Sequence, residues 1–288
     1  MPNWEKRAQG PGLYLIATPL GNARDITLRA LDLLASVDVL VAEDTRSLRK
    51  LMDIHGVPMG DRPLVAYHEH NGARMRPKLL AWLHEGRSVL YASEAGTPLV
   101  ADPGFDLVRA AREAGHAVTA APGPVAAITA LSIAGLPTDR FLFAGFLPNA
   151  SGQRKSALMA LREVPATLVF YESPKRVAAM LRDAAEALGA DRQARICREL
   201  TKKFEEIRSG TLSELAETCT DDPPRGEIVV LVDRGDLGSV REDDLEQLLR
   251  GALEGHSVRD AADRISAQTG LPRRKVYQLA LKLEQDMT

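Results

Sequence analysis

The chain has 288 residues, of which 45% are hydrophobic and 26% are charged, the proportions of an ordinary soluble globular protein. Its 37 basic and 39 acidic residues give a formal net charge of -2, which excludes a wholly basic nucleic-acid coat protein but permits local basic patches. Only Cys197 and Cys219 are present, so a disulfide framework and a cysteine-based zinc site are excluded. No apolar run reaches the ~18 residues of a membrane helix. We therefore expect a cytoplasmic protein with no metal and no membrane contact, long enough for two domains.

The first segments alternate strand and helix. Residues 13–17 predict a strand that runs into the loop TPLGN, and Thr27 is a typical cap for the helix that follows. Residues 37–42 predict a second strand, which ends in EDTRSLRK, so acidic and basic side chains gather at its carboxyl end. This pattern indicates either a ligand site or a solvated helix start with acids at its positive end.

A further strand is expected within residues 64–71, where His68 and His70 alternate as they would along a strand. A metal site would need another ligand, and none is found nearby in the sequence. A structural role or a contact at the edge of a cleft is therefore the favoured interpretation of the two histidines.

The stretch VLYASEAGTPLVADPG, residues 89–104, gives the strongest indication of a binding site. A buried strand breaks there into a loop of small residues with two acids, Glu94 and Asp102. A helix follows, and then a second strand that ends in Pro122-Gly123-Pro124 before a helix of small residues. Ligands of open α/β sheets bind at the carboxyl ends of strands, so two such loops, brought side by side by a parallel crossover, predict a small-molecule site. The alternative is a pair of surface turns shaped by Gly and Pro.

A change in composition near Pro137 predicts a domain boundary. Beyond it, LVFYESPKRV is a buried strand that ends on Glu172, followed by Lys175 and Arg176, and RELTKKFEEIRSGT is a mixed-charge run that is either a solvated face or part of a cleft. An aromatic strand is expected within residues 135–148. The helices predicted after it are 156–163, 177–188 and 213–218, and the strands are 167–171, 194–198 and 227–232.

The tail, from Arg241, predicts two short helices joined through Gly270 and Pro272. It resembles a helix-turn-helix whose second helix begins with basic residues, as suits a phosphate backbone, although a helical appendage packed on the main body is an equal alternative. The expected architecture is therefore α/β, with two α/β domains and a ligand cleft between them, plus a small C-terminal helical segment. The predicted domains are residues 1–136, 137–236 and 237–288. The predicted core of the tail is Val258, Ala262, Ile265, Val276, Leu279 and Leu283.

Several common motifs are absent from the sequence. There is no G-x-G-x-x-G after the first strand, no phosphate-binding G-x-x-x-x-G-K-[ST] and no G-x-S-x-G. Hydride transfer, nucleotide hydrolysis and serine hydrolase chemistry are therefore disfavoured.

Six stretches carry a more specific pattern: LYLIATPLGNARDIT, VLVAEDTR, SEAGTPLVADPG, APGPVAAITALSIAGLPTDRFLFAGFLP, LVFYESPKR and GEIVVLV. Together they resemble the small-subunit ribosomal RNA cytidine 2'-O-methyltransferase family, within the tetrapyrrole-methylase superfamily of class III S-adenosylmethionine-dependent enzymes. The resemblance covers almost the whole chain from Leu13, including the tail. One departure is Glu94, where the family usually has an aspartate; the charge is kept and the side chain is longer.

The resemblance implies a two-domain α/β enzyme of the tetrapyrrole-methylase type, usually a homodimer, that binds S-adenosylmethionine in a cleft between its domains. Such an enzyme methylates the ribose 2'-hydroxyl of a decoding-centre cytidine in 16S rRNA, on the assembled small ribosomal subunit. Small residues at strand ends allow the backbone to approach the cofactor, and nearby acids offset its sulfonium charge. The cofactor-binding residues expected from the strand ends of both halves are Ser93, Glu94, Ala95, Gly96, Pro122, Gly123, Val125, Ala126, Phe170, Tyr171 and Ile228.

Two acids are expected to engage the acceptor hydroxyl, Asp44 and Glu172, because one comes from each half and each is followed within a few residues by arginine. The alternative is that they pair with Arg46 and Arg176 and only order the cleft. The basic residues expected to bind RNA phosphates are Arg24, Arg46, Arg49, Lys175, Arg176, Arg273, Arg274 and Lys275.

Two other functions remain open. A cleft of this superfamily can also methylate a tetrapyrrole or a modified protein histidine, as in diphthine synthesis, although the EDTR segment and the basic tail favour RNA. In a different class, the chain would be a ligand-sensing regulator that binds duplex DNA through its tail.

Overall fold

The computed structural model describes residues 3–234, 242–269 and 271–287 of the chain, with the side chains at 242–244 and 285–287 left aside. Its contacts group into two compact units. The larger unit spans residues 1–162 and 166–233 and holds both sheets, and the smaller unit spans residues 163–165 and 234–288. Among the described residues no helix combines the length and the apolarity needed to cross a bilayer.

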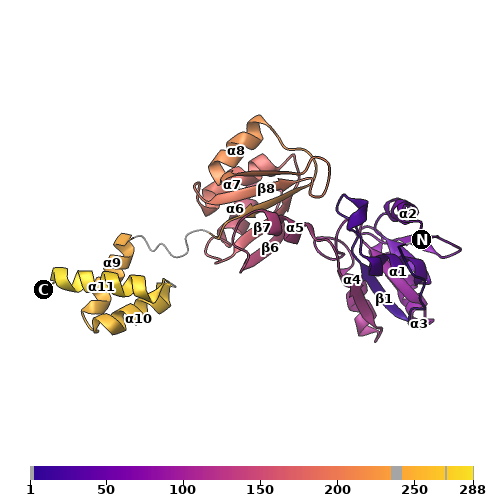
Figure 1. Cartoon of the computed structure of the whole chain (residues 1–288), viewed down its shortest axis with the longest axis horizontal. Helices are drawn as coiled ribbons and strands as arrows, with labels where there is room; N and C mark the ends of the chain where they lie inside the picture. The colour runs from indigo at the N-terminus through magenta and orange to yellow at the C-terminus, as the bar shows by residue number, and fades with distance from the viewer. Residues whose placement is uncertain (1–2, 235–241, 270, 288) are drawn as a thin grey trace. The chain divides into compact units, whose positions relative to one another are not determined.

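The first sheet is entirely parallel, with strand order β3-β2-β4-β1-β5 (Figure 1). Four helices cover it, and the helices α1 and α2 contribute to one buried apolar cluster while α3 and α4 contribute to another. Strands buried on both faces explain the uninterrupted apolar runs in the sequence. The strands are β1 (Gly12–Ile16), β2 (Val39–Ala42), β3 (Leu64–Ala66), β4 (Ser88–Ala92) and β5 (Val118–Ala121). The helices are α1 (Leu28–Ser36), α2 (Thr45–Ile54), α3 (Gly72–His84) and α4 (Phe105–Glu113), and a short 3-10 helix, η1, spans Ala23–Asp25.

The loops after β4 and β5 lie side by side as predicted, since the hydroxyl of Thr97 donates a hydrogen bond to the Pro124 carbonyl at 3.0 Å. The two strands are not adjacent, because β1 lies between them and pairs with both, so the loop after β1 meets the other two. The expected strand-like alternation of His68 and His70 is wrong, because β3 ends at Ala66 and a turn follows, in which the side chain of Asn71 accepts a hydrogen bond from the His68 N–H at 2.9 Å. The predicted cap at Thr27 is confirmed, since its hydroxyl accepts a hydrogen bond from the Ala30 N–H.

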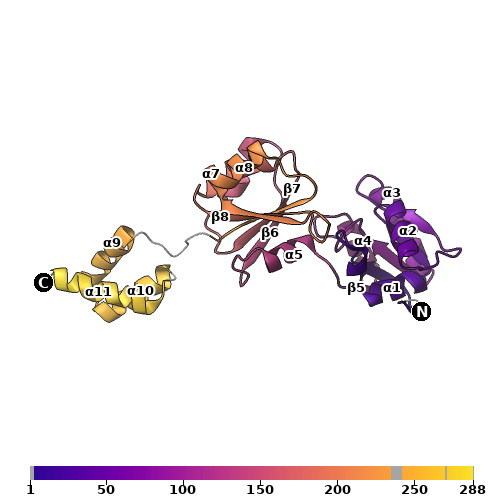
Figure 2. The same ribbon diagram turned by 45° about the horizontal axis from the view of Figure 1, so that its top comes forward.

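The second sheet is mixed, with strand order β6-β7-β10-β8-β9. Strands β6 and β7 are parallel, and the other pairs are antiparallel. Helix α5 packs on one face, and α7 and α8 cover the other, as Figure 2 shows. The strands are β6 (Phe141–Phe146), β7 (Thr167–Glu172), β8 (Gln193–Arg198), β9 (Glu206–Thr211) and β10 (Ile228–Val232). The helices are α5 (Ala126–Ile133), α6 (Ser151–Met159), α7 (Val177–Leu188) and α8 (Leu212–Asp221).

The mixed-charge run after residue 198 contains strand β9, which the sequence did not predict. It lies at the edge of the sheet and carries Glu206 and Arg208, the kind of charged side chain that keeps an edge strand from pairing with another molecule. The strand therefore lacks the alternation of apolar and polar residues by which a strand is predicted from sequence. Helix α6 also begins at Ser151, earlier than the predicted residue 156.

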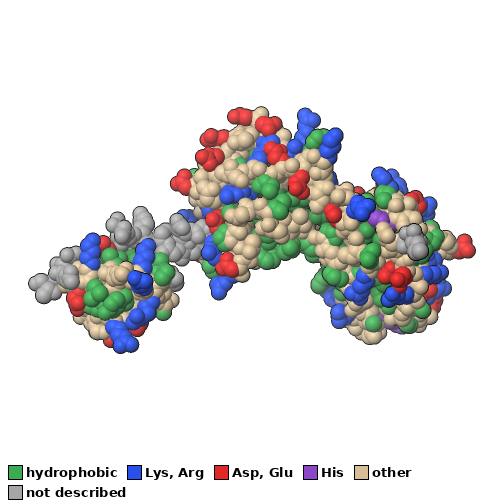
Figure 3. All heavy atoms as spheres, viewed as in Figure 1, with side chains coloured by type: hydrophobic (Ala, Val, Ile, Leu, Met, Phe, Trp, Pro, Cys, Tyr) green, Lys and Arg blue, Asp and Glu red, His purple; other side chains and the backbone are tan. Residues whose placement is uncertain are grey.

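The smaller unit contains three helices among its described residues: α9 (Glu242–Leu253), α10 (Val258–Thr269) and α11 (Arg273–Met287). Figure 3 shows hydrophobic side chains among the charged ones on the surface of these helices. Only the last two helices were predicted. Leu245 and Leu249 of α9 complete the buried cluster, which includes the predicted Ala262, Ile265, Val276 and Leu283. Val258 and Leu279 are partly buried against it, and the predicted junction at Gly270 lies outside the described residues.

Candidate functional site: a cavity lined by carboxylates

A cavity of about 660 Å³ lies within the larger unit, at the carboxyl ends of strands from both sheets. Its volume is in the range of small-molecule sites. The loops after β1, β2, β4, β5, β7 and β8 contribute to it, together with the start of α2, the end of β6 and the segment that leads into β10. The lining residues are Pro19, Leu20, Gly21, Glu43, Ser47, Glu94, Ala95, Gly96, Thr97, Val100, Ala101, Asp102, Val125, Ala126, Phe146, Tyr171, Glu172, Ser173, Pro174, Leu200, Gly226, Glu227, Ile228 and Val229.

The loop after β4 is held in place by the loop after β1. Thr18 and Gly96 exchange two backbone hydrogen bonds of 2.9 Å, and the hydroxyl of Ser93 donates to the Gly96 carbonyl at 3.0 Å. Gly96 has a φ of +79°, and a Cβ there would lie 3.2 Å from the side chain of Leu20. A glycine at this position therefore permits both the turn and the close approach of the two loops.

Unusual backbone angles gather in the loops at this cavity. Within the described ranges, four residues other than glycine have a positive φ: Leu99, Ala101, Glu199 and Thr201. The first two lie in the loop after β4, and the other two lie in the loop after β8. Each such conformation costs roughly 1–3 kcal/mol and persists where the surrounding structure imposes it, which is typical of ligand sites.

The charged residues that line the cavity are all acidic. Five carboxylates line it, and no lysine, arginine or histidine is among the lining residues given above. Glu172 pairs with Arg176, and Glu227 pairs with Lys202. The other three acids, Glu43, Glu94 and Asp102, have no ion-pair partner among the described residues. Glu43 and Asp102 are half-buried and Glu94 is exposed, so their unbalanced negative charge makes the cavity suited to a cationic ligand.

These three acids come from the loops after β2 and β4, and the charges of Glu43 and Glu94 affect the pKa of Asp102. Burial raises the pKa of the Asp102 carboxyl to about 6, and the charges of Glu43 and Glu94 act in the same direction, whereas the nearby Ser93 hydroxyl acts in the opposite direction. Burial, followed by the charges of Glu43 and Asp102, also raises the pKa of Tyr91, which lies beneath them. A carboxyl with a pKa this close to neutrality changes its charge readily when a cation binds.

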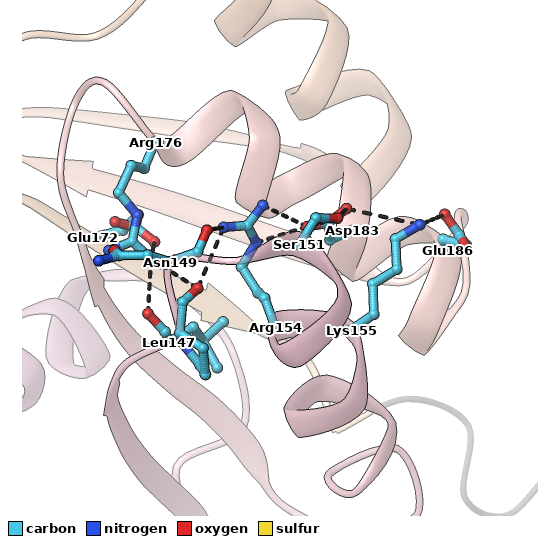
Figure 4. A network of polar contacts seen from close by, with 10 residues as sticks. Leu147, Asn149, Ser151, Arg154, Lys155, Glu172, Arg176, Asp183 and Glu186 are labelled. Atoms are coloured by element: carbon cyan, nitrogen blue, oxygen red, sulfur yellow. Dashed lines mark hydrogen bonds and ion pairs between the residues drawn. The ribbon is translucent and has the colours of Figure 1, made fainter.

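Figure 4 shows how Glu172, at the end of β7, is fixed in the second half of the cavity. Its side chain is 1% exposed, accepts a hydrogen bond from the Ser173 N–H at 2.8 Å and lies 3.2 Å from the guanidinium of Arg176. Arg176 also donates to the Leu147 carbonyl at 2.7 Å and to the side chain of Asn149. Most of its hydrogen-bonding capacity is thus used inside the protein, which supports an ordering role rather than the predicted phosphate contact.

A second arginine, Arg154, also binds the segment between β6 and α6 that contains Asn149 (Figure 4). Arg154 of α6 donates to the Asn149 carbonyl at 3.0 Å and forms a buried, two-point contact with Asp183 of α7, at 2.7 and 2.6 Å. Ser151 donates to the same carboxylate at 3.0 Å. The position of Glu172 therefore depends on a connected set of balanced charges between α6 and α7.

Asp44, the other predicted catalytic acid, is not among the cavity-lining residues. Its carboxylate caps α2, accepts a hydrogen bond from the Arg46 N–H at 2.8 Å and lies 3.4 Å from the Arg46 guanidinium. The hydrogen bond from that N–H lowers the pKa of Asp44. Its neighbours Glu43 and Ser47 line the cavity instead. The geometry thus favours the structural alternative for Asp44.

Seven of the predicted cofactor-binding residues line the cavity: Glu94, Ala95, Gly96, Val125, Ala126, Tyr171 and Ile228. The others support it from behind. Ser93 is buried and holds the β4 loop, and a Cβ on Gly123 would lie 2.7 Å from the Cβ of Ala17. Phe170 is fully buried, because alternate residues of a strand face opposite sides and its neighbour Tyr171 is the one on the cavity side. Pro122 does not line the cavity.

Several lining residues were not among the predicted site residues. Asp102 was noted in its loop but not placed in the site, because the acids that raise its pKa come from other segments. Phe146 was part of an expected strand, yet the residue is 57% exposed and its ring centre lies 5.7 Å from that of Tyr171. The signal that could have identified both is their position at or just beyond the end of a strand.

The predicted basic residues separate into two groups. Those of the larger unit that remain exposed are Arg24, Arg46, Arg49 and Lys175. Arg273, Arg274 and Lys275 are exposed at the start of α11 in the smaller unit, where Arg273 pairs with Asp263 and lies over the ring of Tyr277.

The larger unit is similar in sequence and in structure to a known class of enzymes. The sequence model for Tetrapyrrole (Corrin/Porphyrin) Methylases matches residues 12–216. Uroporphyrin-III C-methyltransferase from Thermus thermophilus, solved with S-adenosylhomocysteine, superposes with a TM-score of 0.56 and 19% identity, covering 77% of this chain and 97% of that one. Diphthine synthase gives a TM-score of 0.60 at 14% identity, covering 77% and 89%. The larger unit thus has the fold of the tetrapyrrole methylases, a class of methyltransferases.

Relatives with higher sequence identity show to which family within this class the chain belongs. The chain is 48% identical over 275 residues to "Ribosomal RNA small subunit methyltransferase I" of Mesorhizobium japonicum, covering 95% of this chain and 92% of the relative. It is 37% identical over 273 residues to the protein of the same name from Bacillus subtilis, covering 92% of each. The RsmI C-terminal HTH domain matches residues 239–284. The chain belongs to the ribosomal RNA small subunit methyltransferase I family, and the expectation of S-adenosylmethionine as cofactor is confirmed.

Proposed function

We propose that the protein transfers a methyl group from S-adenosylmethionine to the ribose 2'-hydroxyl of a decoding-centre cytidine in 16S rRNA, on the assembled small ribosomal subunit. The observation that carries the proposal is the cavity of five carboxylates without a lining cation, in a chain closely related to ribosomal RNA methyltransferases. Because the cofactor bears a sulfonium and an ammonium, the charge of the cavity complements it.

The cofactor supplies a methyl group on an excellent leaving group, so the protein's main tasks are positioning and control of charge. Glu43, Glu94 and Asp102 hold positive charge in the half of the cavity formed by the first sheet. The small residues Ala95 and Gly96 let the backbone approach the ligand closely. Tyr171 and Phe146 offer aromatic surface for a flat, heterocyclic part of it.

Glu172 is the group we propose for the acceptor hydroxyl. Its Oε2 is buried, has no hydrogen-bond donor of good geometry and is oriented by the nearby guanidinium of Arg176. A fixed carboxylate can accept a hydrogen bond from the ribose hydroxyl and take up its proton as the methyl group is transferred. Asp44, by contrast, has a structural role in this proposal, because its carboxylate caps the start of α2.

Exposed basic side chains of both units support an RNA substrate. Arg24, Arg46, Arg49 and Lys175 are proposed to contact phosphates, together with the basic start of α11. We also propose that the protein acts in the cytoplasm as a homodimer. The exposed apolar side chains of Ile128 and Ile133 on α5 and of Phe141 on β6 support the dimer, because association would remove them from water.

The test is incubation with labelled S-adenosylmethionine and small subunits from cells that lack the enzyme, followed by nucleoside analysis of the 16S rRNA. Labelled 2'-O-methylcytidine is expected. Protein-free 16S rRNA should accept far less label if the assembled subunit is the substrate. Label on a base, or preference for a tetrapyrrole or a diphthine precursor, would contradict the proposal. Tight binding of duplex DNA without any transfer to subunits would favour a regulator instead.

A further inference from the structure

A second hollow, of about 590 Å³, lies on the larger unit and does not share a lining residue with the carboxylate cavity. It is formed by the loop between β8 and β9, the start of β9 and the loop between α8 and β10. Its lining residues are Arg198, Lys203, Phe204, Glu205, Glu206, Arg208, Asp222, Pro223, Pro224 and Arg225. We call this hollow the Phe204 groove.

Phe204 gives the groove an exposed aromatic surface. The residue is 63% exposed, although a phenyl ring gains from being buried, and the ammonium of Lys203 lies 5.4 Å from the ring centre. An exposed ring beside a lysine is the arrangement that proteins use to stack a base while holding its phosphate.

The charges in the groove are only partly balanced. Glu206 pairs with Arg198 at 2.5 Å and with Arg208 at 3.1 Å, and Arg208 also pairs with Asp222 at 2.7 Å. Lys203 and Arg225 are exposed, and the described part of the chain offers neither of them an ion-pair partner. These two cations line the same groove as Phe204 and outnumber its remaining acid, Glu205, so the groove is suited to an anionic ligand.

The groove and the carboxylate cavity use opposite ends of the same two loops. Leu200, Gly226 and Glu227 line the cavity, whereas Lys203 and Arg225 line the groove. A chain bound in the groove can therefore continue into the cavity over a short stretch of protein surface.

The two loops are joined firmly to each other. The ammonium of Lys202 lies 3.0 Å from Glu199 and 3.1 Å from Glu227, and the backbone N–H of Glu227 donates to the Glu199 carboxylate at 3.0 Å. A Cβ on Gly226 would lie 2.2 Å from that carboxylate, so only glycine fits at this position. The groove thus has a fixed geometry relative to Glu227 at the cavity wall.

We propose that the Phe204 groove binds single-stranded RNA next to the methylated nucleotide, with a base stacked on Phe204 and phosphates held by Lys203 and Arg225. The inference rests on the proposed function, because it names where the strand that flanks the target nucleotide binds. Stacking requires a base that is free of its helix, so the groove selects an unpaired segment over a duplex.

The first test measures binding of a fluorescein-labelled, 12-nucleotide single-stranded RNA to the full-length protein by anisotropy at low salt. Phe204→Ala should weaken binding about fivefold or more, whereas Phe204→Trp should preserve it. Phe105→Ala is the matched control, because Phe105 is also 63% exposed with an arginine 5.4 Å from its ring, yet lines neither cavity. Equal affinity of the Phe204→Ala variant and the wild type would overturn the proposal.

The second test concerns charge. The double variant Lys203→Ala/Arg225→Ala should flatten the salt dependence of RNA binding by about 1.4 units of slope, the value for two phosphates of a single strand. A control double variant, Lys78→Ala/Arg112→Ala, removes equal charge from α3 and α4 and should leave the slope near its wild-type value. An equal reduction in both would mean that only net charge matters and would contradict a specific groove.

Two further measurements separate a failure of the proposed function from a failure of RNA binding at the groove, and base stacking from apolar docking. Crosslinking with 4-thiouridine RNA and trypsin digestion should place the crosslink in the peptide of residues 204–208, and this result does not depend on methyl transfer. Failure of subunit methylation with that crosslink intact would remove the proposed function but not RNA binding at the groove. Phe204→Leu keeps an apolar side chain without a ring; full RNA affinity in that variant would indicate apolar docking, as for a protein partner, and would contradict stacking.

Discussion

Two charged clusters of the larger unit differ in how their charges are balanced. In the carboxylate cavity, Glu43, Glu94 and Asp102 lack cationic partners among the described residues, and burial raises the pKa of Asp102 to about 6. In the network between α6 and α7, the buried Asp183 is matched by Arg154 at 2.6 Å. We infer that the balanced cluster fixes the shape of the protein, whereas the unbalanced one is suited to a positively charged ligand.

The largest expected effect comes from breaking the balanced cluster. Arg154→Met leaves the buried Asp183 carboxylate with only the more distant ammonium of Lys155, at 4.0 Å, which should lower the free energy of unfolding by about 3 kcal/mol in urea titrations. Adding Asp183→Leu should recover most of the loss. Arg109→Ala, which breaks the exposed pair with Asp106, is the control and should change stability by less than about 1 kcal/mol. Similar losses in the two single variants would refute the distinction.

The next effect is on rate. Glu172→Gln keeps the size of the side chain but removes its charge, so single-turnover methyl transfer should fall about a hundredfold with cofactor affinity little changed. Asp44→Asn should retain almost the full rate, because asparagine caps a helix about as well as aspartate. The reverse pattern would transfer the catalytic role to Asp44, and full rates in both variants would leave positioning as the mechanism.

A pH titration tests the unbalanced cluster. If the cofactor requires ionised Asp102, its affinity should rise about tenfold between pH 5 and pH 7, through the carboxyl pKa of about 6. S-adenosylhomocysteine, which lacks the sulfonium charge, should show a weaker dependence in calorimetry. Asp102→Asn should flatten the curve for S-adenosylmethionine. Identical pH curves for the two ligands would contradict recognition of the sulfonium by these acids.

The same carboxyl should affect stability in the opposite sense. The pKa of Asp102 is raised from the usual aspartate value of 3.8 to about 6 in the folded chain. Between roughly pH 4 and pH 6 the folded state therefore binds more protons than the unfolded state, and its contribution to stability falls as the pH rises. Without cofactor, Asp102→Asn should remove this part of the pH dependence of unfolding.

The smallest effect is expected in the tail. Arg274→Ala and Lys275→Ala each remove one exposed cation and should reduce the salt slope of subunit binding by about one unit. Arg273→Ala should have less effect, because Arg273 already pairs with Asp263. A slope that stays unchanged after all three substitutions would exclude the tail from phosphate contact.

The sequence was most informative where one signal dominated. Helix α7 begins at Val177 and ends at Leu188, as its apolar periodicity predicted, and Thr27 caps α1 as expected. The two sheets and the helical tail followed from the same periodicities. Strand β9 was missed because an edge strand with charged side chains gives a weak pattern. Helix α9 was missed although its leucines Leu245, Leu248, Leu249 and Leu253 recur at helical spacing.

The site was predictable only in part. The loop at Gly96 could be located because small residues follow a buried strand. The difference between Asp44 and Glu43 could not, because adjacent side chains point in different directions and only one of them faces the cavity. The raised pKa of Asp102 and the internal contacts of Arg176 likewise depend on segments that meet only in the folded chain.

The central position of β1 also constrains how the chain folds. This strand pairs with β4, through Gly12 and Ser88, and with β5, through Leu13 and Val118, so it has no partner in the sheet among the first residues synthesised. Since ribosomes add about 5–20 residues per second, β1 must wait several seconds for β4 to emerge. Long-range parallel pairing of this kind slows folding, and the first half of the nascent chain is expected to form its sheet only after β4 and β5 have been released.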